Sequence, residues 1–359
     1  MPPRSTRTRL PHFLAVIYGL AIVYASLQPF TNWIAPPPGT PFFLFTPWPL
    51  RWTRFDIIAN VLAYVPFGFL VALVPARLAP RDRLAIAVAA GAALSFPLET
   101  LQMFTPMRDA SIVDLVSNTA GAGLGGMGAI AFVHPSGPRH RVASLRDRLF
   151  LAGTVGDLGL ALVAVWLAVQ VNPGIPLFAS IFDPTPFPAP PGTAPDLAAT
   201  LLEGAHSAFQ LLGVGLFLAL LLRERRHVAG TVLLLIGAAL LVKGIAAKVL
   251  LKPAAWEHWL SPGVSMGVAA GTLLLAMAIW LPRPAQVASA AVALLSSLLA
   301  TLLLPDLVFA RPPLALFDWS YGQLLNFNGL THTVLLAWPV VASVFLFALA
   351  GRPGWGDPR

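Results

Sequence analysis

Long apolar runs, separated by short basic or proline-rich breaks, occupy most of this sequence. A run of about 20 apolar residues is long enough to cross a bilayer as a helix. Ten such runs follow from the pattern, and their ends are soft by several residues. They cover residues 12–28, 56–76, 84–104, 112–133, 149–171, 200–222, 228–251, 263–281, 286–304 and 331–350. The sequence therefore predicts an all-α fold, a polytopic transmembrane helical bundle of about ten spans.

The composition excludes an ordinary soluble domain. Hydrophobic residues make up 57% of the 359 residues and charged residues only 11%, whereas a soluble domain carries about 25% charged residues. Ten spans leave no room for a large aqueous domain. The first run follows Arg4, Arg7 and Arg9 and is similar to a signal peptide. We expect it to be retained, because the span count closes only if it stays.

The formal charge of +8 indicates topology and not nucleic-acid binding. The basic residues lie in short clusters between the apolar runs, as the positive-inside rule describes. With a cytoplasmic N-terminus, sixteen basic residues fall in inside segments and five in outside segments. We therefore expect both termini in the cytoplasm.

Cysteine is absent and the seven histidines show neither HxxxH nor HExxH spacing. A disulfide framework and a cysteine-based metal or redox site are therefore excluded. We expect no resident metal ion or cofactor.

Polar residues of the first half gather at the predicted outer ends of spans two to four. The candidate ligand-binding set is Asp56, Asn60, Glu99, Gln102, Arg108, Asp114 and Asn118. A carboxylate near the centre of a span costs about 2.5–3.5 kcal/mol, so Glu99 should be buried against a partner or a wet cavity. The single cation Arg108 cannot neutralise three carboxylates. Either one carboxyl is protonated, or a cationic or hydroxyl-rich ligand binds there.

The order of these motifs resembles the VanZ-like family over residues 10–133. The resemblance rests on D-x3-N-x5-P-x-G from Asp56 to Gly68, then Glu99-x-x-Gln102, Arg108, Asp114-x3-Asn118 and Gly121. The family takes its name from an accessory protein of glycopeptide resistance linked to teicoplanin. The resemblance implies a multi-pass protein of the bacterial cytoplasmic (inner) membrane and no established reaction.

A near-constant offset relates the two halves of the chain and predicts a parallel internal repeat. Gly68 matches Gly215 at an offset of 147, and Gly121 matches Gly267 at 146. We expect three segments: a VanZ-like domain at 1–135, a degenerate second copy at 136–282 and two appended helices at 283–359. The alternative is chance similarity, since glycine matches are common in membrane helices. The spacing Gly121-x3-Gly125 is typical of a helix-packing face.

Three polar residues in the second half are secondary candidates. Glu203 and His206 lie one turn apart at the start of span six, where a solvated helix end is the simpler interpretation. Lys243 lies deeper and needs a carboxylate, a backbone carbonyl or a water-filled cavity. The asparagine- and glycine-rich segment 321–331 is interpreted as an interfacial turn before the last span.

Three hypotheses for function follow. The first is an envelope protein that binds a lipid-linked or headgroup ligand at the outer polar cluster, with an accessory role in glycopeptide (teicoplanin) resistance. The second is a membrane-embedded enzyme that acts on a polyprenyl-linked or phospholipid substrate, with two carboxylates as general acid and base. The third is a transporter, suggested by the repeat and by Lys243. The expected partners are membrane lipids or a lipid-linked envelope precursor, and not nucleic acid.

Overall fold

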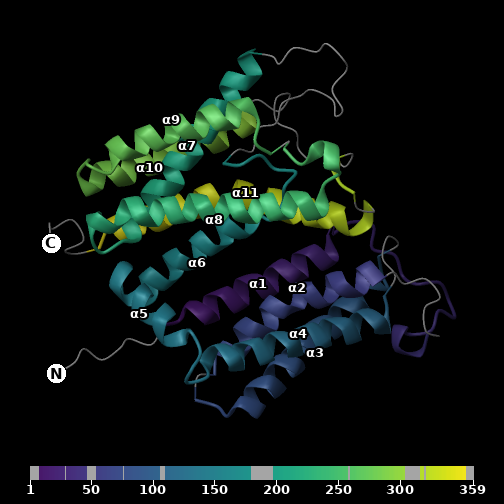
Figure 1. Ribbon diagram of the computed structural model, residues 1–359. Coiled ribbons are helices and arrows are strands. Elements are labelled where there is room, and N and C mark those ends of the chain that lie inside the picture. The colour runs from purple at the N-terminus through teal and green to yellow at the C-terminus, as the bar shows by residue number, and fades with distance from the viewer. Residues whose placement is uncertain are drawn as a thin grey trace. The chain divides into compact units, whose positions relative to one another are not determined.

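The protein is described from a computed structural model that covers residues 8–28, 30–46, 54–75, 77–105, 110–178, 197–257, 259–303, 316–318 and 321–352. Helices dominate these ranges (Figure 1). The α-helices are α1 (Leu10–Leu27), α2 (Arg54–Leu73), α3 (Pro80–Gln102), α4 (Ile112–Val133), α5 (Arg139–Leu149), α6 (Gly153–Val169), α7 (Leu197–Leu221), α8 (Val228–Leu250), α9 (Pro262–Ala278), α10 (Arg283–Leu303) and α11 (Tyr321–Ala350).

Eight helices of the described chain are long and apolar enough to cross a membrane. The helices α6 and α9 are also apolar but have only 17 residues each. Together these ten helices coincide with the ten predicted spans, which confirms the all-α membrane bundle. The additional helix α5 has the polar sequence RHRVASLRDRL and buries none of its residues, so hydropathy alone does not reveal it.

The last helix begins ten residues before the predicted span, at Tyr321 instead of 331. The predicted interfacial turn at 321–331 is therefore wrong, because this segment is helical. Its asparagines do not face water: Asn326 and Asn328 are 7% and 2% exposed. Asn328 accepts a hydrogen bond from Asn172, which gives a polar side chain in the helix a buried partner.

The chain forms two compact units, which we call unit 1 (Met1–Asp147) and unit 2 (Arg148–Arg359). In unit 1, α4 packs along α2 and α3. Glycines allow the close approach to α2, because a Cβ atom at Gly121 would lie 2.3 Å from the carbonyl oxygen of Val61. A Cβ at Gly125 would lie 2.0 Å from that of Val65. The predicted helix-packing role of this glycine pair is confirmed.

Unit 2 is built around α7, which packs against α9 and α10 (Figure 1). The helix α10 packs in turn against α11, and α11 against α6. Glycines again allow two helices to approach closely, since a Cβ at Gly267 of α9 would lie 2.3 Å from the carbonyl oxygen of Gly204 on α7. The α2–α4 and α7–α9 pairs thus use predicted equivalent glycines in the same way. The internal repeat and its boundaries stay a prediction.

Candidate functional site

Three helix ends bring the polar residues of unit 1 together. The first turn of α2 contains Asp56 and the first turn of α4 contains Asp114. A carboxylate at a helix N-terminus is favoured by the helix dipole. Ser111 caps α4, because its side-chain oxygen accepts a hydrogen bond from the backbone N–H of Val113 at 3.1 Å. The last turn of α3 supplies Glu99 and Gln102 to the same end.

A direct side-chain bond joins α2 to α4. The amide Nδ2 of Asn60 donates to Oδ1 of Asp114 at 2.7 Å, and both residues are half-buried. Ser117 donates to the backbone carbonyl of Asp114 at 3.1 Å. The predicted helical face of α2 therefore meets the first turn of α4.

Glu99 is buried, with an exposed fraction of 3%. Its Oε2 accepts a hydrogen bond from the backbone N–H of Ser111 at 3.0 Å, so the carboxylate ties the end of α3 to the start of α4. Gln102, one turn further on, donates through Nε2 to the carbonyl oxygen of Ser26 at 3.1 Å. The Glu99 carboxylate thus has a hydrogen-bond partner, as the cost of placing a charge in lipid requires.

A second polar layer lies one helical turn from the carboxylates. Asn118 donates through Nδ2 to Oγ of Ser95 at 2.9 Å. The Tyr64 side chain lies near Ser95 and near the carboxylates of Glu99 and Asp114. Tyr64 and Ser95 are absent from the predicted site. Helical spacing is the signal that could have found them, since each lies four residues from a predicted member.

One buried acceptor of this layer has no donor. Oδ1 of Asn118 is buried without a hydrogen-bond partner in the described part of the chain, and the residue is 6% exposed. Arg108 lies outside the described residues.

We call Asn60, Glu99, Asp114, Asn118, Ser95 and Tyr64 the α2–α4 cluster. Its unused bonding capacity is that of an acceptor. No group of three possible metal ligands occurs in the ranges the structure describes.

The secondary candidates Glu203 and His206 are buried, at 4% and 2% exposed. The solvated interpretation of this helix start is therefore wrong. Oε2 of Glu203 accepts from Oγ of Ser261 at 2.5 Å, which links α7 to α9. The His206 ring lies 2.9 Å from Oγ of Ser297 on α10. These residues face neighbouring helices because α7 occupies the middle of unit 2 and has little solvated surface.

Lys243 is completely buried in unit 2. Its ammonium donates to the backbone carbonyls of Asn172 at 2.9 Å and Ile175 at 2.7 Å. Backbone carbonyls were one of the three environments that its depth requires, and the structure confirms that alternative. The Asn172 side chain donates to Asn328 and to Thr331, both at 2.8 Å. Sequence inspection missed this network.

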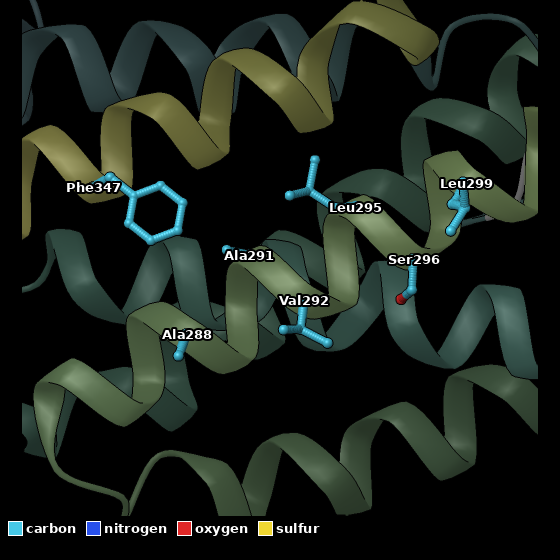
Figure 2. Close-up of a pocket in the computed structure, with 7 residues that line it drawn as sticks. All are labelled: Ala288, Ala291, Val292, Leu295, Ser296, Leu299 and Phe347. Atoms are coloured by element: carbon cyan, nitrogen blue, oxygen red, sulfur yellow. The ribbon is translucent and has the colours of Figure 1, made fainter.

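An open apolar groove of about 410 Å³ lies between α10 and α11 (Figure 2). Figure 2 shows Phe347 of α11 and Leu295 of α10 on its two sides. Small residues such as Ala291 line its α10 side, and among the described residues Ser296 is the only lining residue with a polar side chain. The described lining carries no charged group, so this surface is suited to hydrocarbon.

Comparison with known proteins places unit 1 in context. Residues 7–133 match the model of the VanZ/LLP1 family. The match covers α1 to α4 and every residue of the α2–α4 cluster, so the N-terminal region is VanZ-like and the resemblance seen in the motifs is confirmed. No curated protein and no solved structure matches the chain.

Proposed function

Because residues 7–133 form a VanZ-like region of a multi-pass membrane protein, we propose that the α2–α4 cluster binds a lipid headgroup. The headgroup carries N–H or O–H donors and belongs to a membrane lipid or to a lipid-linked envelope precursor. The protein then acts as a binding or accessory component of the bacterial inner membrane.

The unsatisfied Oδ1 of Asn118 carries this proposal. A buried polar atom without a partner costs about 1–3 kcal/mol, so native proteins rarely leave one. The neighbouring Glu99 and Asp114 carboxylates accept hydrogen bonds and donate none when ionised. A ligand that donates several hydrogen bonds satisfies Asn118 and complements the negative charge at the same time.

The distribution of basic residues supports an outward-facing cluster. Sixteen basic residues fall on the side that holds both termini, if the positive-inside rule sets the orientation. The first turns of α2 and α4 and the last turn of α3 then lie at the outer headgroup level. An outward-facing cluster agrees with the accessory role in the cell envelope that the VanZ-like resemblance implies.

Two lipids of equal charge separate donor recognition from general lipid binding. Phosphatidylethanolamine carries N–H donors, whereas the trimethylammonium group of phosphatidylcholine carries none. The full chain, purified from nanodiscs with equal amounts of both lipids, should retain phosphatidylethanolamine preferentially in native mass spectrometry. Asn118→Leu should reduce this preference about fivefold, the loss of a hydrogen bond worth about 1 kcal/mol.

Two control variants complete this experiment. Asn118→Asp keeps an acceptor at the position and should keep the preference. Glu257→Gln removes an exposed carboxylate of unit 2 and should change nothing. Equal retention of the two lipids by the wild-type protein, or an unchanged preference in Asn118→Leu, would contradict headgroup recognition by the cluster.

The accessory role has its own test in cells. Glu99→Gln and Arg108→Ala should abolish any effect of the protein on teicoplanin susceptibility while leaving its membrane level intact. Wild-type behaviour of both variants, at equal membrane levels, would exclude the cluster from that role.

A further inference from the structure

A stretch of irregular backbone is completely enclosed in unit 2. The helix α6 ends at Val169, and residues 172–178 that follow are non-helical and all buried. In a membrane protein, irregular backbone is tolerated only where protein buries it or where it lines a cavity. Phe178 in this stretch also has a left-handed φ of 55°, which is unusual for a bulky residue.

Lys243 holds this stretch from α8. It lies seven residues before the end of the helix at Leu250, which is a depth of about 10 Å at 1.5 Å per residue. An ammonium has three donors, and the structure gives two of them backbone carbonyls, those of Asn172 and Ile175. Carbonyls solvate the charge but do not neutralise it. No ion pair to Lys243 occurs among the described residues.

Buried donors without acceptors lie around the same stretch. Asn328 accepts a hydrogen bond from Asn172 of this stretch. The Nδ2 of Asn328 is buried and has no partner in the described ranges. Trp259 also contacts this stretch, because its backbone carbonyl accepts a hydrogen bond from the N–H of Leu177 at 3.1 Å. The indole Nε1 of Trp259 is likewise buried without an acceptor. Gln170 Oε1, at the start of the stretch, is a buried acceptor without a donor. Donors therefore predominate even before the third ammonium hydrogen is counted.

We infer that unit 2 contains a second ligand site, at Lys243, Asn328 and Trp259, which binds an oxyanion of the phosphate or carboxylate class. An oxyanion supplies the negative charge that a buried ammonium requires, and it accepts the hydrogen bonds that N–H groups of this kind donate. This site has the opposite polarity to the α2–α4 cluster, whose unused buried atom is an acceptor. It lies in the other unit and does not rest on the function proposed for that cluster.

The probes are two sources of the same group: inorganic phosphate in solution, and phosphatidic acid in nanodiscs. Binding to the full chain is followed by native mass spectrometry and by the shift of the thermal unfolding midpoint, with phosphatidylcholine nanodiscs as reference. The wild-type protein should bind at least one probe. Binding of phosphate identifies a free anion as the ligand, and binding of phosphatidic acid alone identifies a lipid.

Lys243→Met should weaken the binding at least about tenfold, because it removes a charge-assisted hydrogen bond. Lys248→Met is the matched control on the same helix, since Lys248 instead lies 5.7 Å over the Trp256 ring. Trp259→Phe removes one donor while it keeps the ring and should weaken the binding by a smaller factor.

Asn328→Asp tests the same site if Lys243→Met fails to fold. The new carboxylate still accepts from Asn172 and places an anion inside the network, so binding of either probe should be lost while the unfolding midpoint stays level or rises. Failure of the wild-type protein to bind either probe, or equal binding by wild type and Asn328→Asp, would overturn the inference.

Discussion

Asn60 donates a hydrogen bond of 2.7 Å to Asp114, and this bond connects the first two turns of α2 with the first turn of α4. At the same end of unit 1, Glu99 accepts a hydrogen bond from the backbone N–H of Ser111 and so links the end of α3 to the start of α4. Two helices that the glycines of α4 bring into backbone contact are thus fixed in register by a polar pair. The close packing of α2 on α4, together with this register, brings the residues of the α2–α4 cluster to one end of unit 1.

Asn60→Leu tests this pair. The substitution keeps the branched shape of the side chain but removes the donor to a half-buried carboxylate, so we expect a loss of about 1–3 kcal/mol in the free energy of unfolding. Unfolding in detergent micelles, followed by circular dichroism, measures it. The exposed residue Asp82 provides the control Asp82→Asn, for which we expect a change within about 0.5 kcal/mol. Equal stability of Asn60→Leu and wild type would exclude a structural role for the pair.

Gly125→Val tests the close approach of α2 and α4. A Cβ at this position would lie 2.0 Å from the carbonyl oxygen of Val65, so backbone must move. We expect a loss of about 3 kcal/mol or more, or failure to fold, since overpacking alone costs about 1–3 kcal/mol. Gly230→Ala is the control, because nothing lies within 4 Å of its Cβ. It should stabilise α8 by about 0.5–1 kcal/mol. Tolerance of valine at 125 would contradict the contact.

Two adjacent serines of α10 have different surroundings: one makes buried polar contacts with α7, and the other lines the apolar groove. Ser297 accepts from Gln210 at 2.8 Å and contacts His206, whereas Ser296 lines the groove. Ser297→Ala removes the buried acceptor of the Gln210 side chain, so we expect a loss of about 1–3 kcal/mol in the unfolding free energy. Ser296→Ala should be neutral within about 0.5 kcal/mol. A larger loss of unfolding free energy for Ser296→Ala than for Ser297→Ala would contradict the hydrogen bonds assigned to Ser297.

The absence of cysteine makes the predicted orientation directly measurable. Thr40 precedes α2 and Ser144 lies in α5, and both are exposed. On intact cells, a thiol reagent that cannot cross the membrane should label Thr40→Cys and spare Ser144→Cys until the membrane is permeabilised. Labelling of Ser144→Cys on intact cells would reverse the topology and place the α2–α4 cluster on the cytoplasmic side.

The sequence predicted the features that depend on local pattern. Hydropathy identified all ten apolar helices, and helical spacing placed Asn60 and Asp114 on faces that meet. The cost of a charge in lipid predicted a buried partner for Glu99 and allowed the carbonyl environment of Lys243. These inferences need only the chain near the residue and the properties of the membrane.

Features that depend on distant packing escaped the prediction. Asn172 and Asn328 are 156 positions apart, and neither has a periodic signal that indicates the other. Without that contact, the polar segment 321–331 has the composition of a turn, although it is the start of α11. Glu203 and His206 have the pattern of a solvated helix start, and only the central place of α7 in unit 2 buries them.

Cross-linking locates the headgroup that we propose the α2–α4 cluster binds. Phosphatidylethanolamine with a photoreactive group next to its amine is incorporated in nanodiscs with the full chain, and cross-linked peptides are identified by mass spectrometry. Headgroup binding at the α2–α4 cluster predicts cross-links within 54–60 and 110–118, the starts of α2 and α4, which diminish in Asn118→Leu. Cross-links confined to the opposite end of unit 1, at 77–84 around the start of α3 and at 130–138 around the end of α4, would contradict it.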